Sequence, residues 1–257
     1  MTGLDGLRLD RDGDVATITL DDPEKLNRVS MVARDQLSTL FAELGADTSV
    51  RAIVLTGSGD RAFTAGGDIA GFLEREPEEL SRLAVNVAAP ERCPKPVIAK
   101  LRGYVLGIGL ELALACDFRL AADTVELGFP EVKLGMIPGS GGTQRLTRLV
   151  GLGRAKDMIM RGRRIGADEA LAAGLVTEVV AAGELDAAVG RLIGELRALS
   201  PLALEVAKRV LNHADEGPLS LGLELEGLAY GLLRTTHDFR EGVEAFGEKR
   251  PPRFEGR

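Results

Sequence analysis

The chain has 257 residues, with 32 Lys and Arg against 39 Asp and Glu, and so carries a formal net charge of −7. This length suits one large domain, or a domain with a smaller appendage. The acidic balance argues against nucleic acid as a partner, because nucleic-acid surfaces need clustered positive charge. The two histidines, His213 and His237, and the two cysteines, Cys93 and Cys116, leave little material for a disulfide framework, a zinc site or a serine–histidine nucleophile. If the chain is an enzyme, we expect carboxylates and backbone amides to do the chemistry.

No targeting or membrane segment is expected. Residues 1–14 are acidic and lack the apolar core of a signal peptide. The longest apolar run, Tyr104–Cys116, is interrupted by Glu111 and is too short to cross a bilayer. Two cysteines in a chain of this length suit a reducing compartment. The sequence therefore predicts a cytoplasmic protein.

The first elements in chain order are strands followed by one helix. Residues 7–10 and 15–20 are expected to be two strands joined by a hairpin turn. Ser30 is a candidate helix cap, and apolar residues follow it at helical spacing. Residues 51–56 are expected to be a buried strand. The apolar positions of the helix are Val32, Leu37, Leu40, Phe41 and Leu44.

Later segments continue the alternation and then change to helices alone. Residues 97–101, 118–121 and 176–180 are expected to be strands, and the all-apolar residues 110–115 a buried helix. Strands that alternate with helices indicate an α/β core. From Glu184 onward the pattern is helical, which predicts a helical C-terminal part. The expected helices there are 184–199, 201–213, 219–233 and 238–246.

Two glycine-rich loops are similar to phosphate cradles, but neither completes its motif. Residues 57–62 match the G-x-G-x-x-G/A pattern of dinucleotide sites, but residues 63–68 are a poor start for the helix that such a site requires. Residues 135–143 are similar to a P-loop without its Gly-Lys pair. A nicotinamide-dependent oxidoreductase is therefore not favoured, and no cofactor or metal is expected.

Two glutamates are the strongest candidates for chemistry. Glu111 is the sole charge in its apolar run, and a buried carboxylate normally has either a task or a buried ionic partner, for which Arg119 and Lys100 are the candidates. Glu131 follows a short strand and, taken alone, fits a solvated loop carboxylate. Two acids in one apolar pocket have their pKa values pushed apart and can divide acid and base roles.

Taken together, the order and spacing of several motifs resemble the crotonase superfamily, and most closely its enoyl-CoA hydratases, over nearly the whole chain. The resemblance implies an α/β fold, a spiral of ββα turns with a helical C-terminal part. It implies a core with the acyl-CoA site at 1–190 and a helical trimerisation part at 191–257, in a homotrimer or a hexamer built as a dimer of trimers. The motifs that carry it are 23–27, 51–57, 62–68, 95–99, 103–107, 111–117, 128–145, 162–165, 173–176 and 241–250.

The resemblance also implies the catalytic groups of an acyl-CoA thioester site. The backbone amides of Ala65 and Ile108 match the family's oxyanion hole, which stabilises the enolate-like charge on the thioester oxygen. Glu111 and Glu131, twenty residues apart, match its two catalytic glutamates. By this resemblance Glu111 orients the attacking water and Glu131 delivers the proton to Cα.

The resemblance further implies which residues bind the substrate. Lys25, Arg28 and Lys249 are candidates for phosphate contacts, with ordinary solvated charges as the alternative. Ile108 stands where the family usually has glycine, which could narrow the acyl pocket. The other expected substrate-binding residues are Leu26, Gly66, Gly67, Asp68, Ile69, Leu106, Gly107, Pro130, Leu134 and Gly139.

The expected activity is that of an enoyl-CoA hydratase in fatty acid metabolism. It adds water reversibly to a trans-2-enoyl-CoA and gives a 3-hydroxyacyl-CoA, with coenzyme A as part of the substrate. One alternative is an enoyl-CoA isomerase or another crotonase reaction on the same scaffold. A second is a non-catalytic paralogue that binds acyl-CoA. The presence of both Glu111 and Glu131 favours the hydratase, because the family's isomerases usually keep a single working acid.

Overall fold

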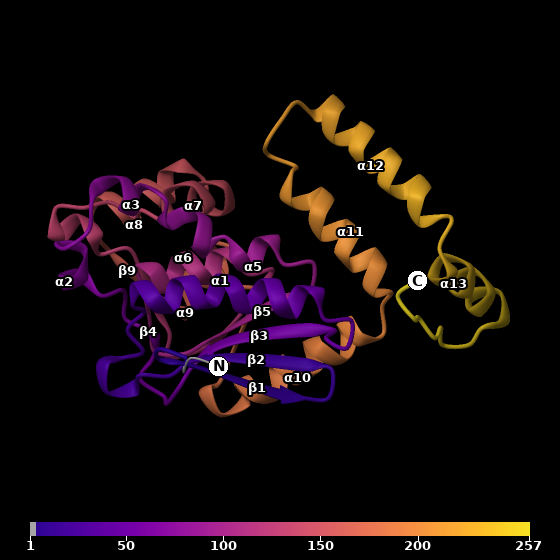
Figure 1. Cartoon of the computed structure of the whole chain (residues 1–257), viewed down its shortest axis with the longest axis horizontal. Coiled ribbons are helices and arrows are strands. Elements are labelled where there is room, and N and C mark those ends of the chain that lie inside the picture. Colours follow the sequence, from indigo (N-terminus) through magenta and orange to yellow (C-terminus); the bar gives the residue numbers. More distant parts are fainter. Residues whose placement is uncertain (1–3) are drawn as a thin grey trace. The chain divides into compact units, whose positions relative to one another are not determined.

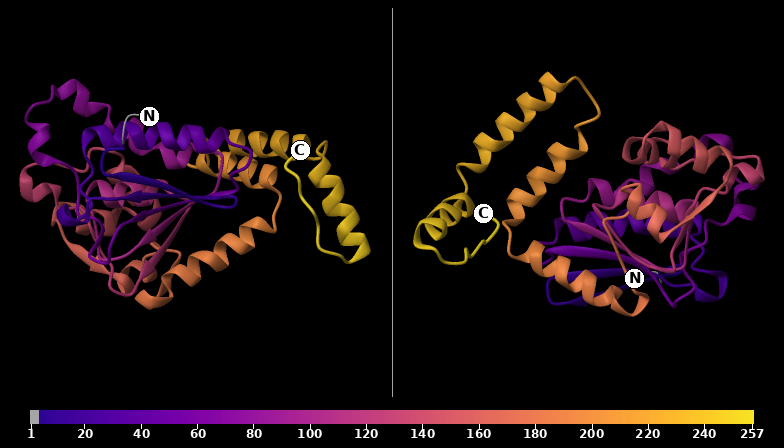
Figure 2. Two further views of the ribbon diagram at one scale, coloured as in Figure 1. Left: turned by 60° about the horizontal axis from the view of Figure 1, so that its bottom comes forward. Right: turned by 180° about the vertical axis from the view of Figure 1, so that it is seen from behind.

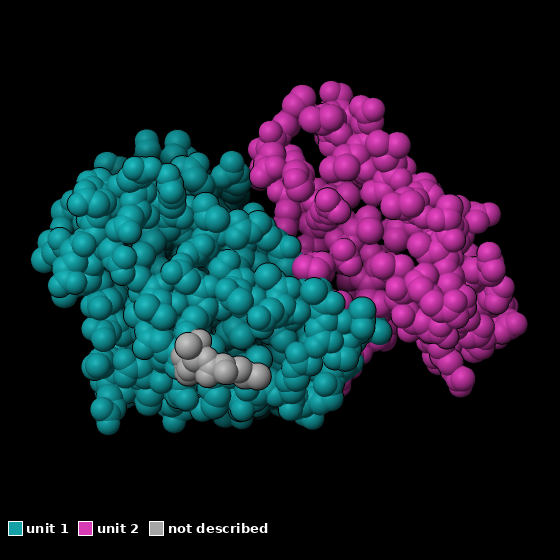
Figure 3. All heavy atoms as spheres, viewed as in Figure 1, with its two compact units in different colours: residues 1–93, 97–189 teal, residues 94–96, 190–257 magenta. Residues whose placement is uncertain are grey.

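The structure is a computed structural model that describes residues 4–257. Residues 1–3 lie outside the described residues. They belong to the acidic segment 1–14, in which we expect no signal peptide. The chain divides into two compact units, coloured separately in Figure 3. One runs up to Cys93 and continues through Val97–Val189, and the other consists of Pro94–Pro96 and Gly190–Arg257. No helix within residues 4–257 is both long enough and apolar enough to cross a bilayer.

Two sheets form the framework of the first unit (Figures 1 and 2). The larger has the order β1-β2-β3-β5-β7-β10, in which β1 is antiparallel to β2 and all other neighbours are parallel. The smaller has the order β4-β6-β8-β9, in which only β9 is antiparallel. The strands are β1 (Leu7–Asp12), β2 (Val15–Leu20), β3 (Ala52–Gly57), β4 (Ala62–Thr64), β5 (Val97–Leu101), β6 (Tyr104–Leu106), β7 (Phe118–Ala122), β8 (Glu126–Gly128), β9 (Arg164–Gly166) and β10 (Glu178–Val180).

Successive turns of the chain place one strand in each sheet and then add a helical segment. The pairs β3 and β4, β5 and β6, and β7 and β8 all follow this rule, so the expected spiral of ββα turns is confirmed. The helical segments of this unit are η1 (Pro23–Lys25), α1 (Met31–Ala46), α2 (Ile69–Phe72), α3 (Pro77–Ser81), α4 (Leu83–Val87), α5 (Ala89–Arg92), α6 (Ile108–Ala115), η2 (Glu131–Leu134), α7 (Gly142–Val150), α8 (Leu152–Met160), α9 (Ala167–Ala172) and η3 (Ala182–Glu184).

The core of this unit lies between the larger sheet and its helices. Every residue of β3 is buried, as expected for a central strand covered on both faces. The helix α1 begins after Ser30, whose hydroxyl accepts a hydrogen bond from the Ala33 amide at 3.0 Å. Leu37 and Phe41 of α1, each 1% exposed, belong to the same apolar cluster as Ile53 of β3. The helical periodicity of the apolar residues in α1 and the β-branched residues of β3 therefore produce the packing of α1 on the larger sheet.

A buried asparagine holds the turn before α1 against the connection between β3 and β4. Asn27 is 1% exposed and has a φ of 56°, a left-handed conformation that asparagine tolerates better than most residues. Its Nδ2 donates to the carbonyls of Ser58 and Ala62 at 2.9 and 2.8 Å, while its Oδ1 accepts from the Asp22 amide at 3.1 Å. The contacts with Ser58 and Ala62 fix the connection that leads to β4, and the contact with Asp22 closes the turn before α1.

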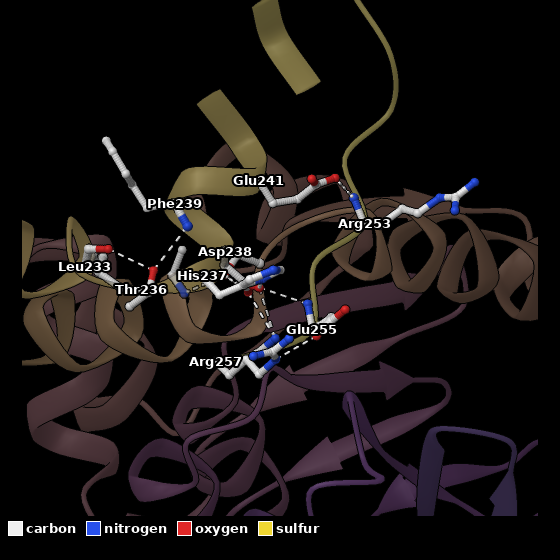
Figure 4. A network of polar contacts seen from close by, with 12 residues as sticks. Leu233, Thr236, His237, Asp238, Phe239, Glu241, Arg253, Glu255 and Arg257 are labelled. Carbon is white, nitrogen blue, oxygen red and sulfur yellow. Dashed lines mark hydrogen bonds and ion pairs between the residues drawn. The ribbon is translucent and has the colours of Figure 1, made fainter. Parts of the chain in front are cut away.

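Helices follow at almost the expected positions: α10 (Leu185–Arg197) begins in the first unit and continues into the second, which also contains α11 (Pro201–Asn212), α12 (Leu219–Leu233) and α13 (His237–Glu248). The final residues are tied to α13 through a buried carboxylate (Figure 4). Asp238, 2% exposed, accepts hydrogen bonds from the amide of Glu255 at 2.8 Å and from the hydroxyl of Ser200 at 2.6 Å. Its own amide donates to the Arg257 carbonyl at 3.1 Å. These bonds give Asp238 a structural role.

Replacing Asn27 tests the importance of its turn. We expect Asn27→Ala to lower the free energy of unfolding by about 2–4 kcal/mol, because the carbonyls of Ser58 and Ala62 lose their donor in a buried position. The measurement is urea unfolding followed by circular dichroism. Asn86→Ala, which removes a surface hydrogen bond to Asp35, is the control. Equal midpoints for the two variants contradict the expectation.

Candidate active site

Three neighbouring strands of the smaller sheet end at one edge. The strands β4, β6 and β8 are parallel, with Thr64 opposite Val105 and Leu106 opposite Gly128. Ligand sites of parallel sheets form beyond the carboxyl ends of the strands, where the connecting segments meet. The segments that follow β4, β6 and β8 all contain residues that the sequence marks as site candidates.

These segments surround a cavity of about 490 Å³. Its wall is mostly apolar, with both candidate glutamates among the exceptions. The predicted residues that line it are Ala65, Gly66, Gly67, Ile69, Gly107, Ile108, Glu111, Pro130, Glu131, Leu134 and Gly139. The lining residues without a sequence prediction are Arg34, Phe72, Leu80, Leu83, Gly135, Met136, Ile137 and Ser140.

Glu111 is a buried carboxylate held by backbone amides. It lies in the first turn of α6 and is 3% exposed. Its Oε1 accepts hydrogen bonds from the amides of Ser140 and Gly142 at 2.7 and 3.1 Å. Burial raises the pKa of Glu111, while these amides and the positive charge of Arg34 act in the opposite direction. The contacts therefore favour the ionised form of a carboxylate that burial alone would neutralise.

The suggested ion pair of Glu111 with Arg119 or Lys100 is wrong. Arg119 donates instead to three backbone carbonyls, those of Leu175, Cys116 and Ala113, at 2.8, 2.7 and 3.3 Å. Lys100 pairs with Asp186 at 2.5 Å. Both cations lie on strands of the larger sheet, away from the edge where α6 begins.

Glu131 lies in a different environment, although it faces the same cavity. It is the first residue of η2, three residues after the end of β8. Its Oε2 is buried and has no hydrogen-bond partner among residues 4–257. Burial raises the pKa of Glu131 to about 7, and the nearby charge of Glu111 acts in the same direction. Glu131 is therefore the carboxyl group that holds a proton near neutral pH, which a solvated loop carboxylate does not do.

Two glycines allow α6 to approach the other parts of the site. Gly107 has a φ of +56°, and a Cβ there would lie 3.0 Å from Oε1 of Glu131. A Cβ at Gly109 would lie 2.9 Å from the carbonyl oxygen of Thr64, at the end of β4. Side chains at these positions are therefore excluded by the close contact of α6 with both neighbouring segments.

One of the two predicted oxyanion donors fits the structure and the other does not. Ile108 is the first residue of α6, where backbone N–H groups have no partner within the helix. The Ala65 amide, by contrast, already donates to the Leu26 carbonyl at 3.0 Å. The Gly67 amide, on the same loop and also in the cavity wall, donates to no acceptor among the described residues. On this loop the amide that is free to donate into the cavity is therefore that of Gly67 and not that of Ala65.

The remaining predicted residues do not line the cavity. Arg28 and Asp68 form an ion pair with each other at 3.1 Å. Lys25 is exposed, and Lys249 ends α13 in the second unit. Leu26 accepts the hydrogen bond of the Ala65 amide through its carbonyl, and Leu106 ends β6 directly before Gly107. Residues 4–257 contain no group of three or more His, Cys, Asp or Glu that could hold a metal ion.

Because the pKa of Glu131 is raised, replacing its carboxyl group by a neutral amide is predicted to increase the free energy of unfolding, and by an amount that depends on pH. Because its folded-state pKa of about 7 lies above the ordinary 4.5, stability falls as the pH rises through this window. We expect Glu131→Gln to be more stable than the parent by about 1–2 kcal/mol at pH 8, and by much less at pH 5. Urea unfolding at both pH values measures this. The control is Glu126→Gln on β8, and an equal gain at pH 5 and pH 8 contradicts the expectation.

Comparisons with known proteins agree with the geometry. Residues 10–257 match the family model described as enoyl-CoA hydratase/isomerase. A short-chain-enoyl-CoA hydratase of Clostridium acetobutylicum is 36% identical over 96% of each chain, and a crotonyl-CoA hydratase of Syntrophomonas wolfei is 38% identical over 96% of each. The crystal structure of an enoyl-CoA hydratase from Bacillus anthracis, 36% identical, superimposes with a TM-score of 0.92 over 98% of this chain and 100% of that one. The chain therefore belongs to the enoyl-CoA hydratase/isomerase family, also called the crotonase family, and its family implies an acyl-CoA substrate.

Proposed function

We propose that the protein is an enoyl-CoA hydratase, which adds water reversibly to a trans-2-enoyl-CoA to give a 3-hydroxyacyl-CoA. Relatives with hydratase names at 36% and 38% identity support this assignment. The observation that carries it is the presence of two carboxyl groups, Glu111 and Glu131, in the wall of one apolar cavity. Hydration requires one group that activates water and one that supplies a proton.

The amides of Ile108 and Gly67 hold the thioester oxygen in this proposal. As water attacks Cβ, electrons move through the conjugated system and negative charge develops on that oxygen. Two fixed N–H donors stabilise this charge without reorganising, and the N-terminus of α6 adds its positive end. The adjacent apolar wall binds the acyl chain.

The two glutamates then divide the proton transfers. Glu111, held in its ionised form by the amides of Ser140 and Gly142, orients the water and accepts hydrogen bonds from it. Glu131, with its raised pKa, gives its proton to Cα. The water proton released on attack restores the acid, so that one water molecule is added in total and both carboxyl groups return to their starting state.

Amide variants of the glutamates test this division. With crotonyl-CoA as substrate, the wild type is expected to remove the absorbance of the conjugated enoyl thioester. Glu111→Gln and Glu131→Gln are each expected to lower kcat by at least about 100-fold, because the first loses the carboxylate that orients the water and the second loses the proton donor. The control is Glu126→Gln, which changes an exposed glutamate on β8 in the same way.

The outcomes of this assay also distinguish the alternatives. Full activity in both glutamate variants contradicts the two-acid mechanism. Formation of a conjugated thioester from a 3-enoyl-CoA, without hydration of crotonyl-CoA, supports an isomerase instead. Binding of acyl-CoA without turnover of either substrate supports a non-catalytic paralogue.

We further propose that phosphate groups of the coenzyme A part meet Lys25, Arg28 and Lys249, as the family resemblance implies. Arg28 is already oriented by Asp68 at 3.1 Å, with its side chain partly exposed. We likewise propose a location in the cytoplasm and a role in fatty acid metabolism.

We also propose a homotrimer or a dimer of trimers, in which residues 191–257 make subunit contacts. Exposed apolar side chains on α12 support it, because such patches mark interaction surfaces. We expect light scattering to give three or six times the 27.3 kDa of one chain, and the double variant Leu228→Glu with Leu232→Glu to lower this mass. A monomeric wild type contradicts the proposal. The exposed side chains are Leu219, Leu221, Leu223, Leu228, Tyr230 and Leu232.

A further inference from the structure

A buried arginine lies in the wall of the proposed acyl pocket. Arg34, in the first turn of α1, is 4% exposed and lines the same cavity as Glu111 and Glu131. Its other neighbours in the wall include the apolar Phe72 and Leu83. A cation in such surroundings is costly unless its N–H groups are paired. The hydrogen bonds of Arg34 therefore indicate whether its role is structural.

Most of the hydrogen-bonding capacity of Arg34 is unused. A guanidinium group has five N–H donors. Only Nη1 makes a hydrogen bond within residues 4–257, a long one of 3.4 Å to the hydroxyl of Ser140. Nε is buried without a partner. The Phe72 ring lies 5.4 Å from the guanidinium carbon, and no hydrogen bond of Nη2 is formed among the described residues.

Arg119 shows what a structural arginine of this protein looks like. It too is buried, at 9% exposure, but it donates to the carbonyls of Leu175, Cys116 and Ala113. Arg34 has no such acceptors and no carboxylate within 4.0 Å among the described residues. Burial lowers the pKa of Arg34 to about 10, so it is still a cation at neutral pH. The charge of Glu111 therefore attracts Arg34 through space, but no carboxylate among the described residues forms a close ion pair with it.

The free edge of the guanidinium lies beside the proposed path of the acyl chain. A Cβ at Gly67 would lie 2.8 Å from Nη2 of Arg34, so this nitrogen is against the loop whose amide is proposed to hold the thioester oxygen. Glu111 cannot serve as the close partner through Oε1, which the amides of Ser140 and Gly142 already occupy. An acceptor carried by the substrate can approach Nη2 from the cavity, whereas Nε is enclosed by the protein.

We propose that Arg34 binds a carboxylate on the acyl chain, so that the preferred substrate is a 2-enoyl-CoA whose acyl group carries a second, anionic carboxylate. Nη2 offers two N–H donors to a carboxylate, and a hydrogen bond between two charged groups is stronger than one between neutral groups. This assignment of the acyl group rests on the proposed hydratase function. The binding preference itself does not require turnover and is tested separately.

The first experiment compares two saturated five-carbon ligands by titration calorimetry. Glutaryl-CoA ends in a carboxylate where valeryl-CoA ends in a methyl group, and neither can be hydrated. We expect the wild type to bind glutaryl-CoA more tightly, and Arg34→Met to change the ratio of the two Kd values by about 30-fold or more in favour of valeryl-CoA. Arg82→Met removes an exposed cation next to Leu83 and should leave the ratio unchanged.

Two results overturn the proposal: a wild type that prefers valeryl-CoA, or an Arg34→Met variant in which both Kd values change by the same factor. The second result assigns Arg34 a role only in supporting Glu111. If Arg34→Met does not fold, as judged by circular dichroism, Arg34→Lys decides. It keeps the charge but loses the planar fork, and we expect a smaller shift of the ratio in the same direction; an unchanged ratio overturns the proposal.

Turnover then separates this proposal from the hydratase assignment. Glutaconyl-CoA is compared with pent-2-enoyl-CoA, its neutral five-carbon counterpart, and a higher kcat/KM for glutaconyl-CoA is expected in the wild type only. Equal hydration of both substrates overturns the role of Arg34 and leaves the hydratase intact. No hydration of either, together with preferred binding of glutaryl-CoA, overturns the hydratase and leaves the anionic ligand intact.

Discussion

The burial of two carboxyl groups in one apolar cavity is the constraint on which the site depends. Glu111 receives two backbone hydrogen bonds and lies in the field of Arg34, whereas Oε2 of Glu131 has no partner among the described residues. Each negative charge raises the free-energy cost of ionising the other carboxyl group. The site therefore holds its proton on Glu131, which receives fewer hydrogen bonds. In the proposed hydration, two side chains of the same type thereby serve as a water-binding carboxylate and a proton donor.

The backbone around Ser140 and Gly142, whose amides bind Glu111 but not Glu131, is packed against the segment that carries Glu131. A Cβ at Gly142 would lie 2.7 Å from the ring of Phe129, which is fully buried two residues before Glu131. The amides that hold Glu111 therefore rest on the same turn that positions its partner. A change in this packing would therefore affect the backbone around both glutamates.

Residues with a strong local pattern could be predicted from the sequence, and those defined by contacts could not. Glu111 is conspicuous as one charge in an apolar run, but Glu131 has no such signal and depends on the family resemblance. The strands β4, β6, β8 and β9 have three residues each, too few for a period to be recognised. Ala65 and Gly67 are both small residues of the same loop, and only the hydrogen bond from the Ala65 amide to Leu26 distinguishes their amides. Arg34 had a signal, because it lies three residues before Leu37 and seven before Phe41, on the buried face of α1.

Arg34 also bears on how much charge the cavity can hold during the reaction. Its Nη2 lies against Gly67, so the cation is close to the oxygen that becomes negative as water attacks. In a weakly polarisable site such a charge stabilises the enolate more than it does in water. An acyl carboxylate bound at Arg34 would neutralise this contribution, and the enolate would then rely on the amides of Gly67 and Ile108 and on the end of α6. In the proposed reaction a neutral acyl chain would leave the cation available to the enolate but would leave Nη2 without an acceptor. In the proposed reaction, the same arginine would thus set a balance between binding an anionic acyl group and stabilising the transition state.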